Sequence, residues 1–453
     1  MAKERETFGS RYAVIMAMAG SAIGLGNIWR FPYTVGQGGG ALFILIYLLA
    51  SLLVALPILL SETVIGRRAG CGTFGAMEKL APGTRWKWLG LLTVFSPLII
   101  LSYYSVVGGW AVDYLMKALT LQFNTAPSGE IASMFARFTG STWAPLACHT
   151  AFLGMTALIV VAGVKKGIER FASITMPVLF LLMLVIMGCS LSLPGAGAGV
   201  SYLLKPDFSK IGFRVIADAM GQAFFSLSLG VGTILTYASY VHKNENMLTS
   251  GLGTAGFDLL FALIAGFAIM PAVFSAGIEP SAGPGLVFET LPFIFSQMGI
   301  QAPWLGAGVA ILFFFTILVA ALTSSISMLE VGVAWLTEEK GMGRGKATLL
   351  LFGVTWALGC LCSLSFGPLK DFHLAGLTIF ECCDKLTSNF LMSFGGLLFT
   401  LFAGWKMKRA DVWDELTGGG RFRLGTACFG LIYFLIRYVA PLVIVVIFLS
   451  NLF

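Results

Sequence analysis

The residues best suited to bind a solute together with an ion lie in one interrupted apolar segment near the amino end. Six residues in it fit a membrane helix poorly, namely Gly20, Gly24, Gly26, Asn27, Arg30 and Pro32. Glycine has little preference for the helical basin and proline lacks an amide donor, so we expect the helix to break here. Backbone exposed at membrane depth is tolerated where it lines a cavity or binds a ligand. This stretch is interpreted as half of a solute and cation site.

A second interruption of this kind lies halfway along the chain. Glycines and hydroxyls meet again at the centre of an apolar span, at Gly221, Ser226, Ser228, Gly230 and Gly232. Two broken segments at equivalent places in two halves of a chain indicate an inverted-repeat transporter. The amino end of a half-helix can hold a carboxylate, while free carbonyls can hold a cation. The pattern therefore favours a zwitterionic amino acid carried with sodium.

The composition sets the class of protein that must hold these breaks. The chain has 453 residues, of which 57% are hydrophobic and 11% charged, and a mean hydropathy of +0.88. Lipid must be the solvent for most of such a surface, which indicates an all-α integral membrane protein. The net charge of +7 comes from basic residues between apolar spans, so it favours membrane orientation over nucleic-acid binding. The eight cysteines form no CxxC pair and suit an apolar core.

A span needs roughly 20 apolar residues, and eleven segments meet that length. A first five-helix repeat is expected over about residues 10–195, a second over about 212–405, and an extra helix over about 426–449, all in one transmembrane domain. The eleven spans are Tyr12–Val35, Ala41–Ile65, Trp88–Leu119, Trp143–Val164, Phe171–Leu193, Phe213–Val241, Phe257–Gly277, Trp304–Leu336, Ala347–Ser365, Thr378–Trp405 and Thr426–Leu449. A short helix at Leu286–Met298 is expected to pack over one membrane face.

The loops that follow alternate spans carry most of the lysine and arginine, including Arg67, Arg68, Lys165, Lys166 and Lys243. Such loops are typically cytoplasmic. The amino end is therefore expected inside the cell and the carboxyl end outside. Short loops without an N-x-S/T site favour a bacterial inner (plasma) membrane.

Three stretches carry a specific resemblance. They are Gly20–Pro32, Gln222–Gly230 and Leu322–Ser325, each within a predicted span and in the same order as in the relatives. On these motifs the chain resembles the neurotransmitter:sodium symporter family, with its leucine-transporter-type fold, over nearly its whole length. The resemblance implies sodium-coupled symport by alternating access, with the first and sixth of eleven helices broken.

The resemblance also implies two sodium sites made of oxygen ligands, as a hard cation requires. The first would use the carbonyl of Ala22 and the side chains of Asn27, Ser226 and Asp258. The second would use the carbonyls of Gly20, Ile23 and Ala320 and the hydroxyls of Thr323 and Ser324. No organic cofactor is expected.

A substrate pocket beside these ions follows from the same resemblance. The substrate carboxylate would meet the amides of Leu25 and Gly26 and the hydroxyl of Tyr104. The remaining contacts would come from Ala22, Ile100, Phe225, Ser226, Ser228, Val231, Ser324 and Met328. These residues are mostly apolar, so a hydrophobic amino acid is expected. Gly24 stands in the region where monoamine carriers of the family have an acidic residue, which argues against amines that lack a carboxylate.

Asp258 carries an expectation about anions. Chloride-dependent relatives have Asn at this position and Ser four residues on, whereas this chain has Asp258 and Ala262. A fixed carboxylate would supply the negative charge that chloride supplies elsewhere. We therefore expect transport without chloride, and proton countertransport through Asp258 as a weaker corollary.

Two gates and one hinge complete what the resemblance implies. Arg30 and Asp384 would pair across an outer vestibule, above a lid of Tyr104 and Phe225. On the cytoplasmic side Arg5 and Glu338 would pair near Tyr240, although Phe8 stands where many relatives have Trp. The fifth span would unwind at its cytoplasmic end between Gly167 and Pro177.

Several of these motifs also have a simpler explanation. Gly20 and Gly24 form a GxxxG pair, which is commonly a packing motif. The serines and threonines could bond only to the preceding turn. A channel would need a continuous polar path, and an enzyme would need a nucleophile with its base or a metal-ligand set; neither is visible. An amino-acid sensor on the same scaffold, or a carrier of another small zwitterion, remains an alternative. The expected partners are a small amino acid and membrane lipid, with no nucleic acid and no obligate protein partner.

Overall fold

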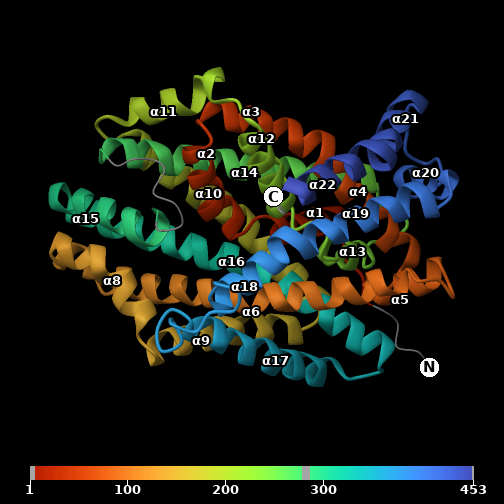
Figure 1. Ribbon diagram of the computed structural model, residues 1–453, viewed down its shortest axis with the longest axis horizontal. Coiled ribbons are helices and arrows are strands. Elements are labelled where there is room, and N and C mark those ends of the chain that lie inside the picture. Colours follow the sequence, from red (N-terminus) through yellow and green to blue (C-terminus); the bar gives the residue numbers. More distant parts are fainter. Residues whose placement is uncertain (1–5, 278–285, 451–453) are drawn as a thin grey trace.

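The computed structural model describes residues 6–277 and 286–450, and these residues form helices and loops without a β-strand. Long helices run along the longest axis of the molecule, as Figure 1 shows. The short helices α8 (Ser128–Gly140) and α15 (Leu291–Gln301) lie at one end. The short helices α5 (Thr73–Leu80) and α20 (Arg409–Thr417) lie at the opposite end. The expected all-α membrane fold is confirmed.

The first predicted break is confirmed. Helix α1 (Arg11–Ala22) ends at Ile23, whose backbone is extended, and a π-helical turn η1 (Gly26–Arg30) continues into α2 (Phe31–Gln37). The two parts are bent by 52°. Pro32 lies beyond the break, in the first turn of α2, where a missing N–H is tolerated.

The second predicted break is also confirmed. Helix α12 (Phe213–Ser226) is followed by α13 (Thr233–Ala238), and the residues between them are not helical. Gly230 and Gly232 have φ angles of 80° and 76°, and Ser228 has a φ of 51°. Positive φ is costly for serine and commonly marks a functional position. The carboxylate of Glu62 accepts a hydrogen bond from the amide of Gly230 at 2.7 Å. This bond satisfies one of the backbone donors that the break leaves without a helical partner.

Among the described residues, nine helices are long and apolar enough to cross a membrane, or ten when the bent first pair is counted. The expected span Phe213–Val241 is missing from this count because its break leaves pieces of 14 and 6 residues. The count of eleven is therefore not confirmed by helix length. The spans are α3–α4 (Ala41–Ala69), α6 (Lys87–Leu119), α9 (Trp143–Val161), η3–α10 (Val164–Leu191), α14 (Met247–Ser275), α16 (Pro303–Glu339), α17 (Arg344–Leu364), α18–η7 (Ile379–Lys406) and α21–α22 (Thr426–Leu449).

The core forms around α16, which packs against α6, α9, α10 and α1. Residues 316–334 of α16 are buried without interruption, which fits a helix surrounded by other helices. The expected short helix at Leu286–Met298 is present as η5 (Leu286–Thr290) and α15. Both breaks face this central packing, because α1 and α13 each contact α16.

Candidate functional site

A cluster of polar side chains joins the two breaks to α14. The Asn27 amide nitrogen donates to Ser226 Oγ at 3.0 Å and to Asp258 Oδ1 at 2.8 Å. Ser226 Oγ donates to the same carboxylate at 2.8–2.9 Å. All three residues are buried. Three of the four residues expected for the first sodium site, Asn27, Ser226 and Asp258, are thus brought together, and Asp258 is the acidic one. No hydrogen bond joins the fourth, Ala22, to this cluster among the described residues.

Tyr47 on α3 is a fourth member of this cluster that sequence reasoning missed. Its hydroxyl lies 3.3 Å from Ser226 Oγ and 3.5 Å from Asp258 Oδ2, and its side chain is fully buried. A single phenol within an apolar run was the available signal. In the described part of the chain, the side-chain partners of Asp258 are all neutral.

A second group of oxygens lies between the first break and α16. Thr323 Oγ1 is 3.3 Å from the carbonyl of Ile23 and 2.8 Å from that of Ala320. Ser324 Oγ is 3.3 Å from Ile23 O and 3.5 Å from Gly20 O. All five oxygens expected for the second sodium therefore converge, and no charged side chain is among them.

A cavity lies where the two breaks meet α6 and α16. All residues expected to contact substrate line it, except Ser226, which belongs to the first cluster. Gly24, which the sequence singled out for substrate selectivity, lines it as well. Met392 also lines it and was missed, and nothing in the pattern around Met392 signals that role. The lining is Ala22, Gly24, Leu25, Gly26, Ile100, Tyr104, Phe225, Ser228, Val231, Ser324, Met328 and Met392.

The polar end of this cavity is formed by the first break. The amide of Leu25 donates to the hydroxyl of Tyr104 at 3.2 Å, and the amide of Gly24 donates to Asn27 Oδ1 at 3.1 Å. A Cβ atom at Gly24 would lie 2.4 Å from Ser324 Oγ, so a larger residue does not fit there. Backbone amides and one phenol thus face an otherwise apolar space.

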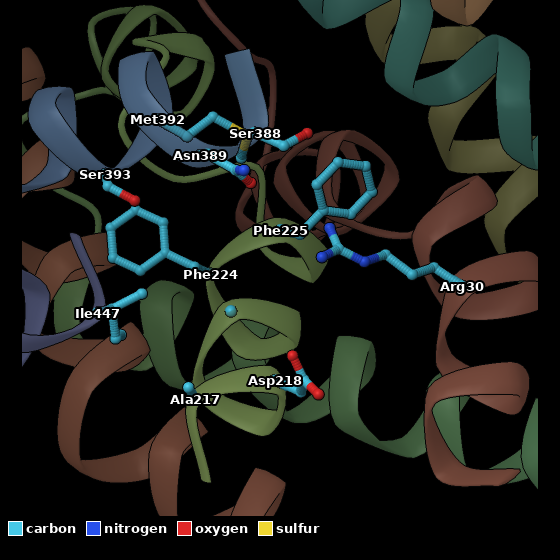
Figure 2. A pocket seen from close by; sticks show the side chains of 11 residues that line it. Arg30, Ala217, Asp218, Phe224, Phe225, Ser388, Asn389, Met392, Ser393 and Ile447 are labelled. Atoms are coloured by element: carbon cyan, nitrogen blue, oxygen red, sulfur yellow. The ribbon is translucent and has the colours of Figure 1, made fainter. Parts of the chain in front are cut away.

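A second cavity adjoins the first, and Figure 2 shows its lining. Arg30 and Asp218 both line it, and Ser388 and Asn389 add polar groups. Phe225 and Met392 line both cavities. These two side chains therefore separate the inner cavity from the outer one.

The expected ion pair between Arg30 and Asp384 is absent in this conformation, although both residues are described. The guanidinium of Arg30 instead lies 4.6 Å from the ring centre of Phe225, a cation–π contact. Asp384 accepts a hydrogen bond from Ser388 at 2.9 Å within its own helix. Each charge thus has a local contact in this conformation.

On the inner side Arg5 lies outside the described residues, so its pairing with Glu338 is not seen. Glu338 accepts the amide of Gly72 at 2.7 Å. The hydroxyl of Tyr240 donates to Glu330 at 2.7 Å. The Phe8 ring packs edge-on against Tyr240 at 6.1 Å and is buried. Phe8, which stands where many relatives have Trp, is therefore packed against the residue expected near the inner gate.

The stretch from Gly167 to Pro177 is helical here. Gly167 lies in the π-helical turn η3 (Val164–Glu169) and Pro177 lies inside α10 (Arg170–Leu191). A Cβ atom at Gly167 would lie 2.1 Å from the carbonyl oxygen of Ile159. The expected unwinding is not present in this conformation and stays a prediction.

Comparison with known proteins extends over the whole chain. The family model described as "Sodium:neurotransmitter symporter family" matches residues 5–134 and 129–453. An uncharacterized sodium-dependent transporter of Bacillus subtilis, YhdH, is 38% identical over 444 residues, covering 98% of this chain and 97% of its own length. An uncharacterized sodium-dependent transporter of Haemophilus influenzae is 35% identical, covering 100% of this chain and 99% of its own length.

A solved structure gives the same result. The crystal structure of MhsT in complex with L-phenylalanine has a TM-score of 0.91 and 41% sequence identity, and it covers 99% of this chain and 100% of its own. The resemblance read from the three motifs is thereby confirmed. The chain is a sodium-dependent transporter and belongs to the sodium:neurotransmitter symporter family.

Proposed function

We propose that the protein imports a hydrophobic amino acid together with sodium by alternating access. The observation that carries this proposal is the cavity between the two broken helices, with two oxygen clusters beside it. Irregular backbone within a membrane is tolerated where it lines a cavity or binds a solute. Substrate and ions would then share one break in the backbone.

The lining of the cavity supports a hydrophobic amino acid. Its walls include Ile100, Val231, Met328 and Met392, while the polar groups gather at the first break. The amides of Leu25 and Gly26 and the Tyr104 hydroxyl would bind the carboxylate, and carbonyls near Ser226 and Ser228 would bind the amino group. MhsT, the structural relative, was crystallised with L-phenylalanine, which fits the same chemistry.

Two sodium ions are proposed for the two oxygen clusters. Asn27, Ser226, Asp258 and the carbonyl of Ala22 would bind the first, and the oxygens around Thr323 and Ser324 the second. Carbonyl, hydroxyl and carboxylate oxygens are the ligands that hard cations prefer. Asp258 would be the one acidic ligand of the first site, and the second would have only neutral oxygens.

Asp258 supports chloride independence. Ala262, four residues further along α14, is buried and offers no hydroxyl for an anion. A carboxylate fixed beside the first sodium would balance its charge in place of chloride.

The gates and the membrane orientation belong to the same proposal. Arg30 and Asp384 would pair in a state other than this one, and Arg5 would pair with Glu338 when the cytoplasmic side is closed. The two five-helix repeats would span about residues 10–195 and 212–405. The protein would lie in the inner membrane, with its amino end in the cytoplasm.

Uptake into proteoliposomes tests the proposal. An inward sodium gradient in chloride-free gluconate buffer should drive saturable accumulation of labelled leucine or phenylalanine above the outside concentration. Potassium in place of sodium should abolish it. Downhill flux without accumulation would contradict symport, and sodium-dependent binding without any flux would indicate an amino-acid sensor.

A further inference from the structure

An open groove lies on the outside of the helix bundle, between α9 and η3–α10, away from the substrate cavity. It is a wide-open hollow lined by residues of both helices. The groove ends where Gly167 meets the backbone of α9, since a Cβ atom there would lie 2.1 Å from Ile159 O. Beyond this contact α9 packs on η3 and has few contacts with α10, so the space between the helices stays open.

The walls of this groove are apolar and exposed. Leu158 on α9 and Ile174 on α10 are 74% and 56% exposed, and Ala162 and Phe171 complete the wall. In a membrane protein such a surface faces the acyl chains of lipid. The hollow is therefore shaped to hold hydrocarbon along the helix axis.

One end of the groove is basic. Lys166 and Arg170 line it four residues apart, on one helical face, and both are exposed. No carboxylate within the described chain forms an ion pair with either of them. Two acidic residues near this end bind backbone amides. Glu6 accepts a hydrogen bond from the amide of Val164 at 2.6 Å, and Glu169 accepts one from the amide of Gly9 at 3.0 Å.

We propose that this groove binds one anionic phospholipid of the cytoplasmic leaflet. Its phosphate lies between Lys166 and Arg170, and one acyl chain lies along Leu158, Phe171 and Ile174. Basic pockets between membrane helices on the cytoplasmic side suit such headgroups. The inference goes beyond amino-acid transport and rests only on the proposed orientation of the membrane.

Native mass spectrometry of the full-length, detergent-purified protein tests the site. Titration with dioleoyl phosphatidylglycerol should give a saturable adduct of one lipid, and dioleoyl phosphatidylcholine should give none at the same concentration. The double variant Lys166→Gln/Arg170→Gln should bind phosphatidylglycerol about 30-fold more weakly, as expected for the loss of two surface charges. The matched control Lys340→Gln/Lys346→Gln removes two exposed basic residues from the junction between α16 and α17 and should bind like wild type.

A third variant separates the groove from general charge. Ile174→Trp leaves both basic residues in place but fills the apolar hollow, and it should also lose the adduct. Gel filtration of each variant checks that it folds. Equal adducts with both lipids, equal loss in the control double variant, or full binding by Ile174→Trp would each overturn the proposal. If a dimer appears in place of the lipid adduct and persists in every sample after lipid is added, the groove would be assigned to a second copy of the chain. That result would also overturn the proposal.

Discussion

Asp258 is the residue that sets the electrostatics of the site. Its carboxylate is buried, and its described partners are the uncharged Asn27, Ser226 and Tyr47. A charge near the membrane centre costs about 2.5–3.5 kcal/mol or more without a partner. A bound cation would offset that cost, so this residue links ion binding to the stability of the site.

Replacing Asp258 by Asn tests this link. We expect sodium to activate uptake at concentrations at least about tenfold higher, because the first cluster loses its only charged ligand. The measurement is the sodium concentration that gives half-maximal uptake in chloride-free buffer. Asp371→Asn, at an exposed loop position, serves as the control and should match wild type. Unchanged sodium activation in Asp258→Asn would contradict the assigned role.

Tyr104 allows a test of the carboxylate end of the cavity. The variant Tyr104→Phe removes the hydroxyl that faces the amide of Leu25. We expect amino-acid binding in saturating sodium to weaken about tenfold, the effect of one lost hydrogen bond to a charged group. Equilibrium binding of labelled phenylalanine measures it.

Its neighbour provides a matched control. Tyr103 is equally buried, but its hydroxyl contacts Thr387, so Tyr103→Phe should keep the binding constant of the wild type. A similar loss in both variants would mean that buried phenols act here through packing.

Sequence reasoning reached much of the site because glycine and polar residues are rare inside apolar spans. The residues it missed are of another kind. Met392 looks like any core methionine, and cavity residues it joins, such as Phe225 of α12, lie more than 160 positions earlier in the chain. Tyr47 joins the cluster in the same way, through folding rather than local pattern.

Helix α20 is attached to the carboxyl end of α4 by hydrogen bonds and ion pairs. Glu415 on α20 accepts hydrogen bonds from Arg67 at 2.6 Å and from Lys243 at 2.8 Å. Burial raises the pKa of the Glu415 carboxyl, but the hydrogen bonds and charges of Lys243 and Arg67 outweigh it and hold the pKa below its usual range. Arg67 is itself buried, so the cluster tolerates the loss of its acid poorly.

This lowered pKa gives a pH dependence with a definite sign. The stability from Glu415 is fully present above the ordinary glutamate pKa of about 4.3 and is lost as the pH falls through the lower folded value. Glu415→Gln should cost about 3 kcal/mol at neutral pH and should flatten the acid side of the thermal unfolding profile. Asp414→Asn, one residue away and exposed, should leave both unchanged. An equally steep acid profile in Glu415→Gln would remove this carboxylate as the cause.

The two breaks were predictable as elements, whereas the π-helical turns were not. Glycines with hydroxyls mark both breaks in the sequence, and Gly230 and Gly232 adopt the positive φ that favours glycine. Turns such as η2 (Ser51–Ala55) and η6 (Leu386–Leu391) contain neither glycine nor proline, so no residue in them marks the extra residue of a π-helical turn inside an α-helix.

For the whole molecule the main prediction is its sidedness. The basic loops and α5 and α20 lie at one end of the long axis, opposite α8 and α15 (Figure 1). We expect Asn244→Cys, next to α14, to face the cytoplasm and Ser209→Cys, before α12, to face outward. Both residues are exposed.

A membrane-impermeant maleimide distinguishes the two sides, in a chain whose native cysteines are replaced. In right-side-out vesicles it should label Ser209→Cys and spare Asn244→Cys, and in inside-out vesicles the pattern should reverse. The opposite pattern would invert the assigned orientation and with it the side on which the lipid groove lies.

The partition made by Phe225 and Met392 has a pharmacological consequence. The ring of Phe225 lies between the inner and the outer cavity and lines both. A compound bound in the outer cavity would press this ring inward and occlude an amino acid bound in the inner cavity. Blockers that enter from the vestibule should therefore slow escape of the trapped molecule rather than compete with it.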